Sequence, residues 1–437
     1  MMMMTMMCRR TKPLTNRRPN WLTGIWSSAA LTTGLAKSTG QGFDSESALT
    51  ETIRDFLPPA EFYSLLTNRG LDFFAGVPDS LLKDFCAYVQ DNTAHAKHII
   101  CANEGASISV AAGYHLSTQK TPVVYMQNSG FGNSVNPLVS LCDPAVYSLP
   151  MLLLIGWRGE PGKRDESQHL VQGRVTPSLL ADLGIPFQVL PDFIEGATAA
   201  VDTAIHTLNT RQGPYALLVR RQCFSRYKLQ SKEAVDDNII LSREEAIELI
   251  ISNTPEWDAF VATTGFTSRE LYELRMKGPI KDGSQKLTRD FLTVGSMGHA
   301  SAIALGIAMG KPSRNIWCLD GDGACLMHMG NMTTIGSRSL PNFKHIILNN
   351  GAHDSVGGQP TGALNIDFPA IAKASGYKTV LSATTSQEIT SAINLLAEAP
   401  GPSLLEIRVI KGARKNLGRP NVRPVDNKHA FMKFLSA

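Results

Sequence analysis

The segment from Asn315 to Ala352 constrains the fold of this chain more than any other. The apolar run Ile316–Leu319 ends at the sequence Asp-Gly-Asp-Gly, and a second apolar run, His345–Leu348, ends at Asn-Asn-Gly. A helix-like stretch, Ala324–Gly336, separates the two runs. Two buried strands joined by a helix form a βαβ unit with parallel strands. We therefore predict a parallel sheet in which both polar sequences lie at the carboxyl ends of strands.

These two strand ends have the composition of a site for a metal ion and a diphosphate. Open α/β sheets bind ligands at the carboxyl ends of their strands. The Asp322 carboxylate, the Asn350 carboxamide and nearby carbonyl groups are hard oxygen ligands that suit Mg²⁺ bound to a diphosphate. Gly321 and Gly323 allow close approach of the backbone, and a helix that begins after Ala324 favours negative charge at its N-terminus. The alternative is that each sequence is an ordinary turn.

Gly-Asp-Gly after one strand and Asn-Asn after the next together resemble the diphosphate-anchoring motif of thiamine diphosphate (ThDP) enzymes. The resemblance implies ThDP and Mg²⁺ as cofactors, with the metal bound by Asp322, Asn350 and the carbonyl of Ala352. Many relatives have glycine at this last position, but a carbonyl ligand requires no particular side chain. The turn at Thr264 and Gly265 is predicted to face the phosphates, although it would also serve as a helix N-cap.

Composition is that of an ordinary globular protein. The chain has 437 residues, enough for two or three domains, and 43% of them are hydrophobic. The net charge is only +4, and no basic stripe indicates nucleic-acid binding. No apolar run approaches the ~18 residues of a membrane-spanning helix. The seven cysteines form no CxxC pair, so we expect buried thiols in a reducing compartment.

Residues 1–47 are excluded from the predicted fold. Six basic residues precede Asp44, which is the first acidic residue, and the stretch is rich in Ser and Thr. A basic, hydroxyl-rich and acid-free segment is typical of an organellar transit peptide. We expect mitochondrial targeting. The alternatives are a disordered tail, or a non-native methionine run from an upstream start codon, on a cytoplasmic protein.

Strand-like and helix-like segments alternate through the rest of the chain, which predicts mostly parallel sheets covered by helices on both faces. We expect two ThDP-binding-fold domains: a pyrimidine-binding domain at 48–227 and a diphosphate-binding domain at 239–437. A polar linker, 228–238, joins them and leaves no room for a middle domain. The clearest predicted strands are Leu71–Gly76, His98–Ala102, Thr121–Met126, Met151–Ile155, Tyr215–Val219, Asp258–Ala262 and Ser403–Val409.

Glu104 follows a predicted strand and begins a predicted helix. An acid in the first helical turn complements the helix dipole, which is reason enough for its presence. However, the sequence Ala-Asn-Glu-Gly-Ala at 102–106 resembles the signature of the pyrimidine-binding domain of ThDP enzymes. That resemblance implies that Glu104 hydrogen-bonds N1′ of the aminopyrimidine and activates the cofactor, which requires a carboxylate held in a dry site.

The segment Trp157–Gly173 is polar and dense in charge, so we predict a loop. It is either a solvated surface loop or a substrate loop with cations for an anionic group. Matching loops in ThDP decarboxylases supply polar side chains, often histidine, to the active site. This implies roles for His169 in catalysis and for Arg158 in substrate binding, with weaker expectations for Asn128 and Ser129.

Met297 precedes a small-residue helix and could be plain core filler. In ThDP enzymes a bulky apolar residue here supports the bent cofactor, and the carbonyl two residues earlier, at Gly295, accepts from its amino group. After Asn350 the chain continues as a Gly-rich loop, where Ser355 and Gln359 could bind a phosphonate or sulfonate. The basic stretch 411–423 is interpreted as an exposed surface.

The two-domain plan with the pyrimidine half first is similar to the family of phosphonopyruvate and sulfopyruvate decarboxylases. The resemblance covers residues 57–409 and implies decarboxylation of a small anionic 2-oxo acid, with phosphonopyruvate favoured over sulfopyruvate. It also implies that a homodimer is the minimal active unit. Another ThDP decarboxylase or carboligase and a catalytically silent cofactor-binding subunit remain alternatives. A NAD-dependent dehydrogenase is disfavoured because no GxGxxG follows an early strand.

Overall fold

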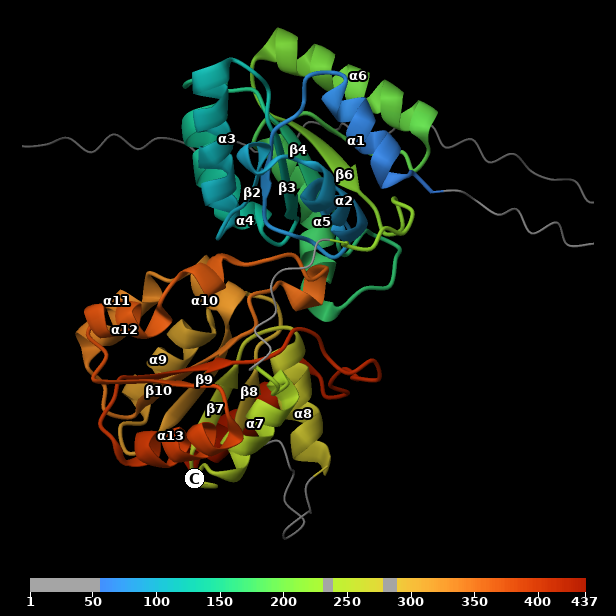
Figure 1. The fold of residues 1–437 in the computed structure, drawn as a ribbon. Coiled ribbons are helices and arrows are strands. Elements are labelled where there is room, and N and C mark those ends of the chain that lie inside the picture. The colour runs from blue at the N-terminus through green and yellow to red at the C-terminus, as the bar shows by residue number, and fades with distance from the viewer. Residues whose placement is uncertain (1–55, 231–238, 278–288) are drawn as a thin grey trace, which may run out of the picture. The chain divides into compact units, whose positions relative to one another are not determined.

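The computed structural model describes residues 56–230, 239–277 and 289–437 (Figure 1). The predicted transit peptide and most of the predicted linker lie outside these ranges. In the described part of the chain, no helix combines the length and the apolar character needed to span a bilayer.

Six parallel strands form the first sheet, in the order β2-β1-β3-β4-β6-β5. The second sheet also has six parallel strands, in the order β11-β12-β10-β9-β7-β8. Read from the opposite edge, the second order repeats the first, so the two sheets share one topology. The strands of the first sheet are β1 (Phe74–Gly76), β2 (His98–Ile100), β3 (Val123–Gln127), β4 (Leu152–Gly156), β5 (Phe187–Val189) and β6 (Tyr215–Val219). Those of the second are β7 (Ala259–Ala262), β8 (Asp290–Leu292), β9 (Ile316–Gly321), β10 (Phe343–Asn349), β11 (Thr379–Ala383) and β12 (Ser403–Arg408).

Helices cover both faces of each sheet, which confirms the predicted fold class (Figure 1). On the first sheet, α1 (Pro59–Thr67), α2 (Lys83–Asn92) and α6 (Ile194–Arg211) cover one face. The other face is covered by α3 (Glu104–Thr118), α4 (Phe131–Pro137) and α5 (Ser167–Asp182). On the second sheet, α7 (Arg243–Ser252), α8 (Phe266–Lys277) and α13 (Ser386–Glu398) lie on one face. The opposite face carries α9 (Ala300–Gly310), α11 (Asn331–Arg338), α12 (Phe368–Ala374) and α14 (Pro424–Ser436).

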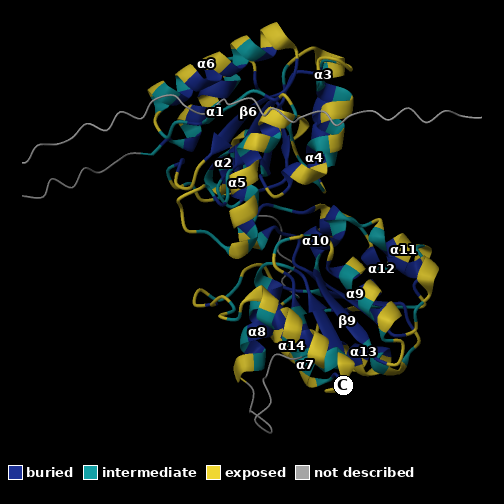
Figure 2. Ribbon diagram, turned by 180° about the vertical axis from the view of Figure 1, so that it is seen from behind, coloured by how far each residue is buried: buried dark blue, intermediate teal, exposed yellow. Residues whose placement is uncertain are grey.

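The central strands are buried on both sides, as Figure 2 shows for β6 and β9. Neighbouring residues of a strand point to opposite faces. In β4, Leu152 and Leu154 therefore join the core on one face, and Leu153 joins the core on the other. In β9, Trp317 likewise joins the core on one face and Cys318 joins the core on the other. Continuous apolar runs are consequently the strand signal in this chain.

Strand order reverses between β1 and β3 and, equivalently, between β7 and β9. In each sheet the chain moves outward by one strand and then returns to the other side of the first. Such switch points leave a crevice beyond the carboxyl ends of the strands, where α/β proteins bind ligands. The fold therefore directs attention to the loops that follow these strands.

Two predicted elements differ from the structure. The predicted helix Ala324–Gly336 is broken into α10 (Asp322–Met327) and α11, with a turn around Gly330 between them. The second half of the predicted loop Trp157–Gly173 is the start of α5. Its buried residues His169, Gly173, Thr176 and Leu180 follow a helical period, which the dense charges of the segment obscured.

Close packing of α11 gives a stability prediction. A Cβ at Gly336 would lie 1.7 Å from the carbonyl oxygen of Ser375. We expect Gly336→Ala to lower the free energy of unfolding by about 1–3 kcal/mol, because the backbone must shift to admit the methyl group. Gly306→Ala, in α9, is the matched control: nothing lies within 4 Å of its Cβ, and alanine favours a helix. Thermal unfolding of both variants checks this, and equal Tm values would contradict it.

Candidate active site

Glu104 is held rigidly at the start of α3, immediately after the turn that follows β2. Asn103 caps the helix by accepting a hydrogen bond from the backbone of Ala106 at 2.9 Å. The Glu104 carboxylate is 4% exposed, and Asn133 donates to its Oε2 at 2.8 Å. Gly130 packs so closely that a Cβ there would lie 1.9 Å from Oε1. Burial raises the pKa of Glu104, partly offset by the Asn133 hydrogen bond.

Arg158 follows β4 and is fixed by side chains on both sides. Its Nε and one terminal nitrogen donate to Asp165 at 2.8 and 2.5 Å, and its other nitrogen donates to Ser80 at 2.9 Å. Burial opposes ionisation of Asp165, but the hydrogen bond from Arg158 holds its pKa well below the usual value. The Asn128 carboxamide accepts from the Arg158 N–H at 3.1 Å and donates to the Arg158 carbonyl at 2.8 Å. Asn128 thus supports the backbone of Arg158.

His169 lies in the first turn of α5 and is 7% exposed. Burial, reinforced by the positive charge of Arg158, lowers the pKa of His169 to about 4. The imidazole is therefore neutral at physiological pH. Its Nδ1 is buried and has no hydrogen-bond partner within the described protein.

Thr264 and Gly295 meet at the carboxyl ends of β7 and β8. The backbone N–H of Gly295 donates to the Thr264 hydroxyl at 3.1 Å. Gly295 has a φ of +70°, a conformation that favours glycine, and this turn leads to Met297. The turn that carries Gly295 is therefore in contact with the loop after β7.

Asp322 and Asn350 leave the second sheet at the same edge. β9 and β10 are parallel and Gly321 aligns with Leu348, so the two polar residues lie one and two positions beyond this pair. Burial raises the pKa of Asp322 to about 6, although Thr361 donates a hydrogen bond of 2.5 Å to its Oδ2. A buried carboxylate without a cationic partner is the environment that a metal ion would satisfy.

Asn350 is oriented by a series of hydrogen bonds and ion pairs that runs through Asp354 and Arg243 to Glu270. Its carboxamide donates to Asp354 at 2.5 Å, and its Oδ1 accepts from the Ala352 N–H at 3.0 Å. Asp354 in turn pairs with Arg243 at 3.1 Å, and Arg243 forms a bidentate pair with Glu270 at 2.7 and 3.0 Å. The Oδ1 oxygen is thereby aimed away from Asp354, with a lone pair left for a cation.

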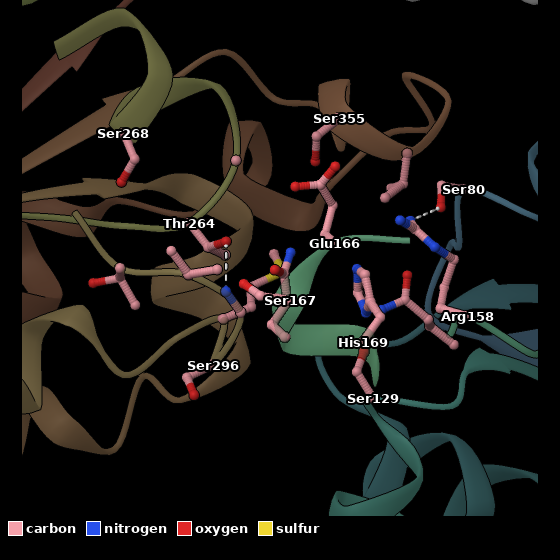
Figure 3. Close-up of a pocket in the computed structure, with 18 of the residues that line it drawn as sticks. Ser80, Ser129, Arg158, Glu166, Ser167, His169, Thr264, Ser268, Ser296 and Ser355 are labelled. Atoms are coloured by element: carbon pink, nitrogen blue, oxygen red, sulfur yellow. Dashed lines mark hydrogen bonds between the residues drawn. The ribbon is translucent and has the colours of Figure 1, made fainter. Parts of the chain in front are cut away.

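A cavity of about 570 Å³ lies within the unit Arg54–Ala437 and is lined by loops of both sheets. Figure 3 shows Ser80, Arg158 and His169 on one side of it, with Thr264, Ser268 and Ser296 on the other. The predicted site residues that line the cavity are Glu104, Ser129, Arg158, His169, Thr264, Gly265, Gly295, Met297 and Ser355.

Other predicted site residues do not line this cavity: Asn128, Gly321, Asp322, Gly323, Ala324, Asn350, Ala352 and Gln359. The helix after the Gly-Asp-Gly sequence was expected to favour negative charge at its N-terminus. This effect is weaker than predicted, because the helix, α10, has only six residues and begins at Asp322 itself. Gln359 is 1% exposed, and its Nε2 donates to the Lys83 carbonyl at 3.4 Å.

Sequence reasoning missed several residues that the structure brings to the site. Asn133, which fixes Glu104, and three further cavity residues, Arg269, His299 and Arg419, were not singled out. Asn133 stands 29 positions from Glu104, and no sequence period connects them. Arg419 belongs to the basic stretch that was interpreted as exposed surface.

Two family models match the chain. The N-terminal TPP-binding domain of thiamine pyrophosphate enzymes matches residues 60–178, and the C-terminal TPP-binding domain matches residues 281–407. The two sheets thus correspond to the two cofactor-binding domains of a thiamine pyrophosphate enzyme.

Three curated relatives extend over most of the chain. A phosphonopyruvate decarboxylase of Streptomyces viridochromogenes is 33% identical over 394 residues, covering 86% of this chain and 94% of the relative. A second, from Streptomyces hygroscopicus, is 34% identical, with coverages of 84% and 92%. The sulfopyruvate decarboxylase of Methanosarcina acetivorans is 24% identical, with coverages of 86% and 96%. The chain belongs to the phosphonopyruvate decarboxylase family.

The described residues fit the cofactors of this family. Glu104 provides a buried, fixed carboxylate at the cavity wall, where an aminopyrimidine nitrogen would bind. The donor set of Asp322, Asn350 and the Ala352 carbonyl consists of hard oxygens, as Mg²⁺ requires. Glu104 and the pair Asp322 and Asn350 both follow the carboxyl ends of parallel strands, and no cationic side chain among the described residues pairs with Asp322.

Glu104 gives the first site prediction. We expect Glu104→Gln to bind ThDP with an affinity within a few-fold of wild type, because the amide keeps the shape and the Asn133 contact. Turnover should fall by about 10²–10⁴-fold, the range for loss of an acid–base group. ThDP titration by intrinsic fluorescence, with steady-state kinetics, measures both quantities. Near-normal kcat would refute the role.

Asp322 and the residues around it give the second site prediction. We expect Asp322→Ala to weaken Mg²⁺ and ThDP binding together, since one site holds both. Asp354→Ala should weaken Mg²⁺ binding by about 10–100-fold, because supports of metal ligands have effects of that size. Ser382→Ala, on an edge strand of the same sheet, serves as control. Cofactor affinity unchanged in Asp322→Ala would show that the metal lies elsewhere.

Proposed function

We propose that this chain catalyses the ThDP- and Mg²⁺-dependent, non-oxidative decarboxylation of 3-phosphonopyruvate to phosphonoacetaldehyde and CO₂. The observation that carries the proposal is the similarity to two phosphonopyruvate decarboxylases over more than four fifths of the chain. The cavity supports it because Glu104 lines the same cavity as three guanidinium groups, those of Arg158, Arg269 and Arg419. A carboxylate that activates a cofactor and cations that attract a multiply charged acid are the two requirements of this reaction.

The overall reaction breaks the C1–C2 bond of the substrate, releases C1 as CO₂ and delivers one proton to C2. When bound, ThDP supplies a thiazolium ring that accepts the electron pair left by the departing CO₂. Glu104 would hold the aminopyrimidine through a hydrogen bond that the surrounding burial strengthens. The Gly295 carbonyl and Met297 would fix the orientation of the cofactor rings.

His169 would act as an uncharged hydrogen-bonding group beside the reacting carbons. Its pKa of about 4 keeps it neutral, so it does not add a positive charge that would hold the substrate carboxylate in place. His169 lines the cavity, and a neutral imidazole there would contact a substrate oxygen or relay the proton that C2 receives.

Sulfopyruvate decarboxylation is the second candidate function. The match to a sulfopyruvate decarboxylase covers 96% of that protein's length, although the two sequences are only 24% identical. The two substrates differ in the oxyanion at C3, so both would fit the same cavity.

The decisive assay measures CO₂ release from phosphonopyruvate and sulfopyruvate, each with and without ThDP and Mg²⁺. We expect release only with both cofactors, and a higher kcat/KM for phosphonopyruvate. Faster turnover of sulfopyruvate would reverse the assignment. Ketol formation with an added aldehyde, without net release of phosphonoacetaldehyde, would favour a carboligase.

Two further expectations remain proposals. A homodimer as the minimal active unit follows from the family resemblance; related sulfopyruvate decarboxylases include proteins named as alpha and beta subunits. Mitochondrial targeting rests on the composition of residues 1–47 alone.

A further inference from the structure

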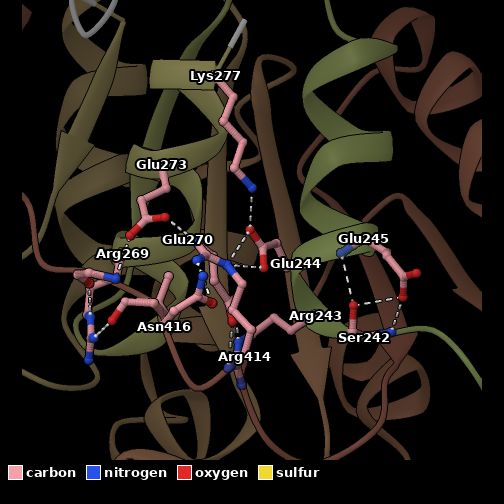
Figure 4. A network of polar contacts seen from close by, with 12 residues as sticks. Ser242, Arg243, Glu244, Glu245, Arg269, Glu270, Glu273, Lys277, Arg414 and Asn416 are labelled. Atoms are coloured by element: carbon pink, nitrogen blue, oxygen red, sulfur yellow. Dashed lines mark hydrogen bonds and ion pairs between the residues drawn. The ribbon is translucent and has the colours of Figure 1, made fainter.

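The basic segment, residues 411–423, is fixed to the helices of the second sheet by a polar network (Figure 4). It connects β12 to α14. Arg269 of α8 donates to the Gly418 carbonyl at 2.6 Å and also to the Leu417 carbonyl. Arg414 pairs with Glu244 at 2.8 Å, and the segment is held further by Glu273. The backbone course of this irregular segment is therefore specified by side chains of α7 and α8.

This anchoring brings Arg419 to the cavity wall. Arg419, Pro420 and Val422 all line the cavity, although the segment is about 250 residues from Glu166 and His169, which line it as well. The Arg419 guanidinium forms an ion pair with the Glu166 carboxylate.

The three guanidinium groups of the cavity differ in how far their donors are committed. Arg158 is bound by Asp165 and Ser80, and Arg269 is bound by two backbone carbonyls. Arg419 is paired with Glu166 in an exposed contact, with side chains 56% and 41% accessible. Exposed ion pairs between long side chains contribute little and are readily exchanged. Of these three guanidinium groups, Arg419 is therefore the one that can change partner at the smallest cost in free energy.

We propose that Arg419 is the specificity-determining residue that recognises the tetrahedral oxyanion at C3 of the substrate, which displaces Glu166 from it. The planar guanidinium presents paired N–H donors that match two oxygens of a phosphonate or sulfonate. Its anchoring segment holds the backbone in place, so substrate binding need only reorient a side chain. This inference rests on the proposed decarboxylation of a 2-oxo acid with a second anionic group.

The test separates recognition of the oxyanion from the rest of the reaction. In Arg419→Ala we expect KM for phosphonopyruvate to rise by about 10–100-fold, the effect of losing a charge-assisted hydrogen bond in a partly exposed site. KM and kcat for pyruvate, which lacks the C3 anion, should change less than 3-fold. Calorimetric titration of the ThDP- and Mg²⁺-loaded protein with 3-phosphonopropionate should show the same loss, while weak binding of propionate stays unchanged.

Three further variants sharpen the result. Arg419→Lys keeps the charge without the paired donors and should lie between Arg419→Ala and wild type. Glu166→Gln removes the competing carboxylate and should lower KM for phosphonopyruvate or leave it unchanged. Arg423→Ala removes a cation of the same segment that pairs with Asp426 outside the cavity and should behave as wild type.

Opposite results overturn the inference. Equal changes for phosphonopyruvate and pyruvate in Arg419→Ala would show a general structural effect, and wild-type affinity for 3-phosphonopropionate would show that another group binds the oxyanion. Failure of the proposed function is distinguishable, because the loaded wild-type protein would then bind 3-phosphonopropionate through Arg419 yet release no CO₂ from any of these acids.

Discussion

Parallel pairing of β9 with β10 is the constraint on which the site in the second sheet depends. The pairing aligns Gly321 with Leu348, which places the carboxylate of Asp322 and the carboxamide of Asn350 at one edge. A shift of one residue in this register would carry every side chain of the strand to the other face. The buried apolar residues of both strands resist such a shift, so the hydrophobic core also fixes the position of these two polar side chains.

Burial of charge is a second constraint, because Glu104 and Asp322 are kept from water by neighbours that only partly compensate their charge. Glu104 has one side-chain donor, Asn133, and Asp322 has one, Thr361. By contrast, Arg243 is fully paired with Glu270 and Asp354. Buried ion pairs of this kind contribute modestly to stability, because desolvation offsets much of the attraction. Their effect here is geometric: they orient Asn350, while Glu104 and Asp322 keep capacity for a cofactor.

Much of this arrangement was predictable from the sequence, and the reason lies in particular segments. The runs Ile316–Leu319 and His345–Leu348 were recognisable as strands because both sides of each are buried and all their residues except His345 are apolar. Glu104 and Asp322 were predicted as site residues because the polar sequences that carry them follow predicted strands and resemble motifs of ThDP enzymes. The strands β5, β8 and β11 were missed, since no continuous apolar run of buried residues marks them. The start of α5 was misassigned because the dense charges of residues 158–166, immediately before it, gave the whole segment the composition of a loop.

The sequence by itself determined the class of fold and the chemistry of the strand ends, because burial on both faces and turn composition are local properties of the chain. Only the tertiary structure decided which side chains support those ends. The contacts of Asn133 with Glu104, of Arg243 with Asp354, and of Arg419 with Glu166 join residues far apart in the chain. Such contacts depend on strand order and loop course, and no local pattern encodes them. The basic stretch 411–423 illustrates the difference: its composition indicated a solvated surface, and its anchoring to α7 and α8 makes part of it a cavity wall.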